Sequence, residues 1–162
     1  MRLKPVPPAP ESLDRIGRVR KAVPLTPGSE TDCCQRLVDR AGVPAQDDAK
    51  TWLTFLRALG LAEETAGGKY VRTRDPRDPD REYLAERVLE RVYGTRELLE
   101  ILGAEGPLTA DQAFEAYRPE IPEWERQRHE NFEHTWRVRV GRMLEWAVLL
   151  GLATTTDGAY DR

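Results

Sequence analysis

Two short segments of the chain contain residue types that could perform catalysis. The segment HENFEH at 129–134 carries two histidines, which a helical zinc site would hold four positions apart on one face. Here they stand five positions apart, which turns one away from the other by about 140° around a helix. The segment AGGKY at 66–70 lacks the upstream glycine and the following serine or threonine of a phosphate-binding loop. We therefore expect neither a metal site nor a nucleotide loop.

Nucleophilic residues are few. Ser12 and Ser29 are the only serines, and the two histidines offer little support for activating either of them. Cys33 and Cys34 are adjacent, so a disulfide between them would be strained, and we expect a reduced, mostly buried pair. Carboxylates are plentiful, but no two stand in a setting that would perturb their pKa values. The sequence therefore predicts a protein that is not an enzyme and carries no cofactor.

The charge of the chain restricts its possible partners. The net charge is −3, with 14 basic and 12 acidic residues in 1–80 and 11 basic and 16 acidic residues in 81–162. Non-specific affinity for nucleic acid usually requires a more basic protein, so any such surface must be local. The longest uncharged apolar run, 146–156, is too short to span a bilayer, and the first ten residues lack the features of a signal peptide. We expect a cytoplasmic protein without membrane contact.

The pattern of the first half predicts three helices and a hairpin. An extended proline-rich arm and three helices are expected at 1–11, 12–23, 31–42 and 46–60. Ser29 and Asp32 have the spacing of a helix cap, and Gly42 and Gly60 end the second and third helices. A β-hairpin with a Gly-Gly turn is expected at 61–73. The third helix has one apolar face, formed by Ala49, Trp52, Leu56 and Leu59.

A second domain is predicted after the segment DPRDPD at 75–80, because its prolines interrupt both helix and strand. Leu84, Val88 and Val92 mark one face of a helix in this domain. Thr109 and Gln112 form a capping pair ahead of a helix at 110–117, and a hairpin follows at 152–162. The longest helix is expected at 123–150, with an apolar stripe of Phe132, Trp136, Val140, Met143, Ala147 and Leu150.

The chain also contains an internal repeat. Pairing 51–67 with 142–158 gives seven identities in seventeen positions. The identical pairs are Leu53/Leu144, Leu59/Leu150, Gly60/Gly151, Leu61/Leu152, Ala62/Ala153, Thr65/Thr156 and Gly67/Gly158. In both copies an apolar helix ends in Gly-Leu-Ala and leads into the hairpin. Two copies of one supersecondary unit are therefore expected.

The repeated unit resembles the winged helix-turn-helix superfamily. The segment LRALGLAEETAGGKYVRT at 56–73 looks like the end of the third helix and the wing of that fold, and LLGLATTTDGAYDR at 149–162 repeats it. The resemblance implies a mainly α fold with short β-hairpin wings. It implies two tandem winged-helix units at 12–74 and 81–162, joined by a linker at 75–80, with an extended third helix in the divergent second unit.

The resemblance also implies a surface for double-stranded DNA in the first unit. In DNA-binding members the third helix enters the major groove and the wing touches the neighbouring backbone. The corresponding residues here are Lys50, Thr51, Thr54, Arg57, Lys69, Arg72 and Arg74. The basic first helix would add Arg15, Arg18, Arg20 and Lys21. Asp47 and Asp48 oppose this contact, because they lie at the helix end that usually approaches DNA most closely.

The second unit carries its basic residues on the long helix, since its wing has none before Arg162. These arginines form two stripes: Arg128, Arg139 and Arg142 flank the apolar stripe, while Arg126 and Arg137 lie with Glu130 and Glu133. Two interpretations stay open. The stripes form a solvated face with ion pairs inside the helix, or they bind phosphate.

The tryptophans divide into two groups. Trp52, Trp136 and Trp146 fall on or beside the predicted core stripes, whereas Trp124 precedes the long stripe. An exposed apolar helix end often makes a dimer or partner contact. The expected interface is Trp124, Arg128 and Phe132 on the helix at 123–150; the alternative is packing on the first domain.

Two functions therefore remain. The chain is a DNA-associated protein and transcription regulator, or it is a non-catalytic protein-interaction adaptor that keeps the fold without binding DNA. Continuous positive charge across the wing, Arg57 and the first helix would favour DNA. Mixed charge there would favour the adaptor.

Overall fold

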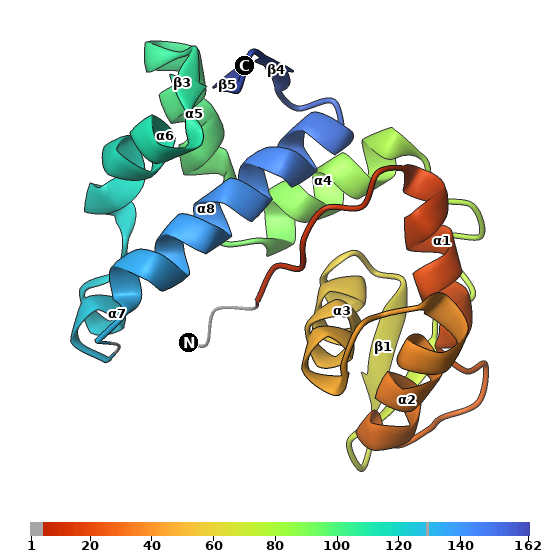
Figure 1. Ribbon diagram of the computed structural model, residues 1–162. Helices are drawn as coiled ribbons and strands as arrows, with labels where there is room; N and C mark the ends of the chain where they lie inside the picture. The colour runs from red at the N-terminus through yellow and green to blue at the C-terminus, as the bar shows by residue number, and fades with distance from the viewer. Residues whose placement is uncertain (1–4, 129) are drawn as a thin grey trace. The chain divides into compact units, whose positions relative to one another are not determined.

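Each half of the chain builds the same order of elements: a helix, a short extended segment, two further helices and a β-hairpin (Figure 1). The computed structural model describes residues 5–128 and 130–162 and divides into two compact units, Met1–Val92 and Tyr93–Arg162. This order of elements in both units confirms the mainly helical fold with short hairpins that the resemblance implies.

The first unit contains three helices and a two-stranded hairpin. They are α1 (Leu13–Ala22), α2 (Glu30–Ala41), α3 (Gln46–Ala58), β1 (Ala62–Thr65) and β2 (Lys69–Arg72). The predicted cap of α2 is confirmed, because the Ser29 hydroxyl oxygen accepts a hydrogen bond from the Asp32 backbone N–H at 3.1 Å. The backbone of Gly28 forms an antiparallel β-bridge with that of Tyr70, so the segment before α2 pairs with β2 of the hairpin.

The core of the first unit lies between α1, α2, α3 and the hairpin. The predicted apolar face of α3 is buried, with Trp52, Leu56 and Leu59 among its members. Both cysteines are buried and reduced on α2, as expected. The repeated Leu-Gly-Leu turn follows α3, and its Leu61 is also fully enclosed.

A fourth helix, α4 (Arg81–Arg91), belongs to the first compact unit. We expected it to open the second domain, after a boundary at 75–80. In the structure α4 contacts α3, and a Cβ atom on Gly60 would lie 2.6 Å from the Tyr83 hydroxyl oxygen. This close packing holds α4 on the first unit, so the division between compact units follows Val92.

The second unit has the same topology with an insertion. Its elements are α5 (Thr95–Glu105), β3 (Leu108–Thr109), α6 (Ala110–Tyr117), a 3-10 turn (Arg118–Glu120), α7 (Glu123–Arg128), α8 (Phe132–Leu149), β4 (Thr154–Thr156) and β5 (Ala159–Asp161). The strands form one antiparallel sheet in the order β3-β5-β4. The capping box of Thr109 and Gln112 is confirmed at the start of α6.

The single long helix predicted at 123–150 is wrong. The helix is interrupted after Arg128, and α8 begins at Phe132 with Asn131 as its N-cap residue. The apolar stripe nevertheless holds over α8, where Trp136, Val140 and Met143 are buried and Phe132 is half-buried. The interruption separates Trp124 from the helix that carries this stripe.

The internal repeat is confirmed at the turn that follows the third helix of each unit. Gly60 and Gly151 have left-handed φ values of 76° and 75°. The backbone N–H of Leu61 donates to the Leu56 carbonyl at 2.8 Å, and the N–H of Leu152 donates to the Ala147 carbonyl at 2.8 Å. Since only glycine adopts this φ without strain, the turn fixes the residue type in both copies.

Buried apolar side chains form the cores of the two units, while Leu25, Trp124 and Val138 are exposed. Among the described residues, no helix combines the length and the apolar character that a membrane span requires.

Candidate nucleic-acid interface

A basic groove of about 840 Å³ lies in the first unit between α1, the end of β2 and the segment 73–79. Among the described residues that line it, the basic side chains are Arg18, Arg20, Lys21, Arg72, Arg74 and Arg77. The carboxylates that line it are Asp14 and Asp78. Five residues expected to contact DNA therefore meet in this one groove: Arg18, Arg20, Lys21, Arg72 and Arg74.

The basic groove has an exposed rim and a buried floor. Arg18 and Lys21 on α1 are exposed, as are Arg74 and Arg77 on the facing segment. The floor includes apolar residues and Arg20, whose exposed fraction is 6%. Asp14 and Asp78 are exposed as well, so four cations and two carboxylates face a polyanion at the rim, and the cations are in excess.

Arg20 fastens the segment 73–79 to α1. Its guanidinium donates to the Thr73 carbonyl at 2.8 Å and to the Arg77 carbonyl at 3.2 Å. Burial lowers the pKa of Arg20, and the positive charge of Arg72 lowers this pKa further. Among the residues that the structure describes, Nε of Arg20 has no hydrogen-bond partner. These two acceptors are neutral carbonyls, and the negative charges of Asp78 and Asp75 offset part of the lowering of the pKa of Arg20.

Arg72 links the wing to the C-terminal end of α1. Its Nε donates to the Val23 carbonyl at 3.0 Å, and its Nη2 donates to the Lys21 carbonyl at 2.9 Å. Cations are favoured at this end of a helix because the carbonyl dipoles point toward it. Arg15, also expected on the DNA surface, donates to the Ala41 carbonyl that ends α2. Both arginines therefore support the fold, and neither has a free guanidinium.

The exposed face of α3 lies apart from the basic groove and has mixed charge. Lys50 is 3.5 Å from a carboxylate oxygen of Glu30, and Arg57 is 3.2 Å from one of Glu64. The guanidinium of Arg57 also stands 5.7 Å above the Tyr70 ring. The Thr54 hydroxyl donates to the backbone carbonyl four residues earlier, at 3.1 Å. None of these described residues, nor the exposed Lys69 on the wing, lines the groove.

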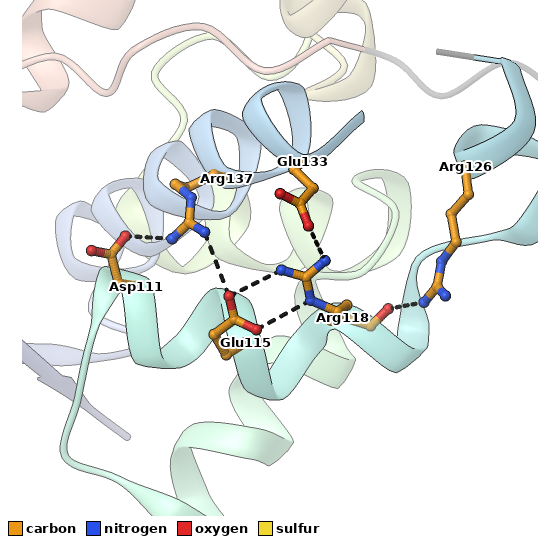
Figure 2. Close-up of polar contacts among 6 residues, drawn as sticks. All are labelled: Asp111, Glu115, Arg118, Arg126, Glu133 and Arg137. Atoms are coloured by element: carbon orange, nitrogen blue, oxygen red, sulfur yellow. Dashed lines mark hydrogen bonds and ion pairs between the residues drawn. The ribbon is translucent and has the colours of Figure 1, made fainter. Parts of the chain in front are cut away.

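In the second unit an ion-pair network joins α6 to α8 (Figure 2). Arg118 pairs with Glu115 at 3.0 Å and with Glu133 at 2.5 Å. Arg137 pairs with Asp111 at 2.7 Å and with Glu115 at 3.5 Å. Both guanidiniums also lie over the ring of Phe114, at 5.0 and 4.4 Å. The hydrogen bonds from Arg118 lower the pKa of Glu115, and the same bonds raise the pKa of Arg118.

This network corrects the expectation for the arginine stripes of the second unit. Arg137 and Glu133 form ion pairs, but their partners lie on or just after α6 instead of on the same helix. Arg126 donates to the Arg118 carbonyl at 2.5 Å, and Arg139 is buried and donates to the Tyr93 carbonyl at 3.2 Å. These contacts engage the guanidiniums of Arg126, Arg137 and Arg139 within the second unit.

The expected partner interface is only partly exposed. Trp124 on α7 has an exposed fraction of 39%, and Phe132 is half-buried at the start of α8. The side chain of Arg128 and all of His129 lie outside the described residues. In the described part of the chain, His, Cys, Asp and Glu side chains form no group of three or more that could hold a metal ion.

One groove residue was missed by the sequence reasoning. Arg77 lies on the exposed rim, but it was assigned to the linker at 75–80 and given no role. The signal was present, since Arg72, Arg74 and Arg77 follow one another at intervals of two and three residues. The sequence did not show that the segment 73–79 lies against α1.

The order of helices and strands in both units is that of a double winged-helix protein. The family model of the halobacterial double winged helix domain matches residues 1–162. The chain belongs to this family. No curated protein and no solved structure matches it.

Proposed function

We propose that the chain binds double-stranded DNA through its first unit and acts as a transcription regulator. The observation that carries this proposal is the basic groove, where basic side chains outnumber carboxylates although the whole chain has a net charge of −3. Local concentration of positive charge is what phosphate recognition requires. The winged-helix family supports the same role, because many of its members bind DNA.

The second unit would mediate association in this proposal. The arginines on and next to α6 and α8 are paired with carboxylates in the network of Figure 2, so this surface is poorly suited to bind phosphate. Trp124 on α7 and Phe132 on α8 offer apolar contact area for a homodimer or a protein partner. Sedimentation velocity of the wild type and of Trp124→Ala tests this role by measuring self-association. The wild type should self-associate, and Trp124→Ala should do so more weakly.

A second candidate function is the protein-interaction adaptor. It is favoured by the face of α3, where Lys50 and Arg57 are paired with carboxylates and Asp47 is exposed in the first turn. The charge test of the two functions thus gives a divided result. Between α1 and the end of the wing six basic side chains and two carboxylates line the basic groove, whereas Arg57 is paired with Glu64.

Fluorescence anisotropy of a labelled random duplex, measured at several KCl concentrations, tests the proposal. The DNA-binding function predicts saturable binding at low salt and a clearly negative slope of log K against log salt. Arg74→Glu should weaken binding, because Arg74 is exposed on the groove rim. Arg72 is unsuitable for this test, since its guanidinium supports α1. Undetectable binding at the lowest salt would remove the proposal and favour the adaptor.

A further inference from the structure

The face of α3 is poorly equipped to read bases. A recognition helix contacts base edges with residues near its N-terminus, and here the first turn carries Asp47 and Asp48. The hydroxyl of Thr51 donates to the Asp47 carbonyl at 3.2 Å, so it is engaged within the helix. The hydroxyl of Thr54 is engaged in the same way, as described above. Repulsion from phosphate and occupied donors therefore both act against insertion of this helix.

The basic groove has the opposite character. Its rim places Arg18 and Lys21 one helical turn apart on α1, and Arg74 and Arg77 on the facing segment. Guanidinium groups match the oxygens of a phosphodiester in paired hydrogen bonds. The buried Arg20 adds positive charge beneath the rim. The groove lining combines basic and aliphatic side chains with the carboxylates of Asp14 and Asp78. Among its described residues it has no aromatic ring on which a base could stack.

We propose that the first unit holds duplex DNA by its phosphodiester backbone along the rim of the basic groove, while α3 reads no bases. Binding is then independent of sequence, and any effect on transcription comes from occupying or shaping DNA instead of recognising an operator. This inference rests on the proposed function and specifies which feature of DNA the chain binds. It differs from the usual geometry of the fold, in which the third helix enters the major groove.

The number of rim cations sets the expected salt dependence. Each neutralised phosphate contributes about −0.9 to the slope of log K against log salt, so four rim contacts give a slope of about −3 to −4. Neutralising two rim cations in Arg74→Gln/Arg77→Gln should reduce its magnitude by about 2. The Arg77 carbonyl that Arg20 uses is backbone, so this variant keeps that contact.

A matched control comes from the same unit. Lys50→Gln/Lys69→Gln makes the same change in net charge at two exposed positions outside the groove. Its slope should equal that of the wild type. Circular dichroism of both variants confirms that they fold. Three duplexes of equal length and unrelated sequence complete the experiment, and their affinities for the wild type should agree within about threefold, against the 10³-fold or more that is typical of sequence recognition.

The outcomes separate this inference from the function on which it rests. The inference is supported if the wild type binds all three duplexes with equal affinity and the magnitude of the salt slope decreases only in the groove variant. Loss of binding in the Lys50 and Lys69 variant with an unchanged slope in the groove variant overturns it, as does a strong preference for one duplex. In both of those cases the chain still binds DNA. A wild type that binds none of the duplexes overturns the proposed function and the inference together.

Discussion

The guanidinium of Arg72 donates a hydrogen bond from Nε to the carbonyl oxygen of Val23 at 3.0 Å. Arg36 on α2 donates to the neighbouring Ala22 carbonyl at 2.7 Å, so arginines from two elements cap the end of α1. Arg72, which the resemblance assigns to the DNA contact of the wing, therefore joins the wing to α1. Its charge still contributes to the basic groove, because carbonyl oxygens do not neutralise it.

Arg72→Gln should destabilise the first unit. The substitution removes two hydrogen bonds from a charged donor to carbonyls at a helix end. Such a loss costs about 2 kcal/mol in the free energy of unfolding. Urea denaturation followed by circular dichroism measures it. Arg74→Gln, which changes an exposed rim residue, is the control and should stay within about 0.5 kcal/mol of the wild type. Equal stability of the two variants would show that Arg72 has no supporting role.

Gly60→Ala should also destabilise the first unit, for two reasons. The φ of 76° is strained for any residue with a Cβ atom, at a cost of about 1 kcal/mol. The new methyl would also lie 2.6 Å from the Tyr83 hydroxyl oxygen, so α4 would have to shift. Tyr83→Phe removes that oxygen, and the cost of Gly60→Ala should be smaller in its background. The urea midpoints of the four proteins in this cycle provide the test. An unchanged cost in the Phe background would contradict the packing of α4 on the turn.

The wing tyrosine of the second unit should make stability fall at high pH. Burial raises the pKa of Tyr160 to about 12, and the hydrogen bond to Glu145 contributes to the same shift. Because the folded state binds this proton more tightly than the unfolded state, its stabilising effect is complete below pH 10 and is lost as the pH rises toward 12. Tyr160→Phe has no such proton, so its urea midpoint should fall less than that of the wild type over this range. Parallel curves would refute the assignment.

The two thiols should be unreactive in the folded protein. Burial raises the pKa of Cys34 to about 11 and raises that of Cys33 as well. The thiolate is the reactive form, so little of it exists at pH 8. With Ellman's reagent at that pH, the native chain should react on the order of 100-fold more slowly than the chain in urea. A native thiol that reacts at the rate of free cysteine would disprove its burial on α2.

Local signals in the sequence predicted much of the fold. The cap at Ser29, the capping box at Thr109 and the left-handed glycines after the third helices are determined by neighbouring residues, so they could be read directly. The interruption between α7 and α8 was missed because helical spacing continues across it without glycine or proline. Asn131, a favourable N-cap residue, was the available signal.

The candidate site was harder to predict for a physical reason. Whether an arginine is free depends on acceptors that are distant in sequence. Arg20 donates to carbonyls more than fifty residues away in the sequence, and Arg137 pairs with the carboxylate of Asp111 on another helix. The sequence shows which residues are basic and which share an element. Only the structure shows that Arg18, Lys21 and Arg74 line one groove, whereas Lys50 and Arg57 are paired with carboxylates outside it.

The most direct test of DNA binding by the groove is an amide NMR titration of the ¹⁵N-labelled chain with a short random duplex at low salt. The account predicts that chemical shifts change at Arg18, Lys21, Arg74 and Arg77 and at their neighbours in the basic groove, with small changes along α3. Shifts concentrated on α3, with the groove unaffected, would contradict it.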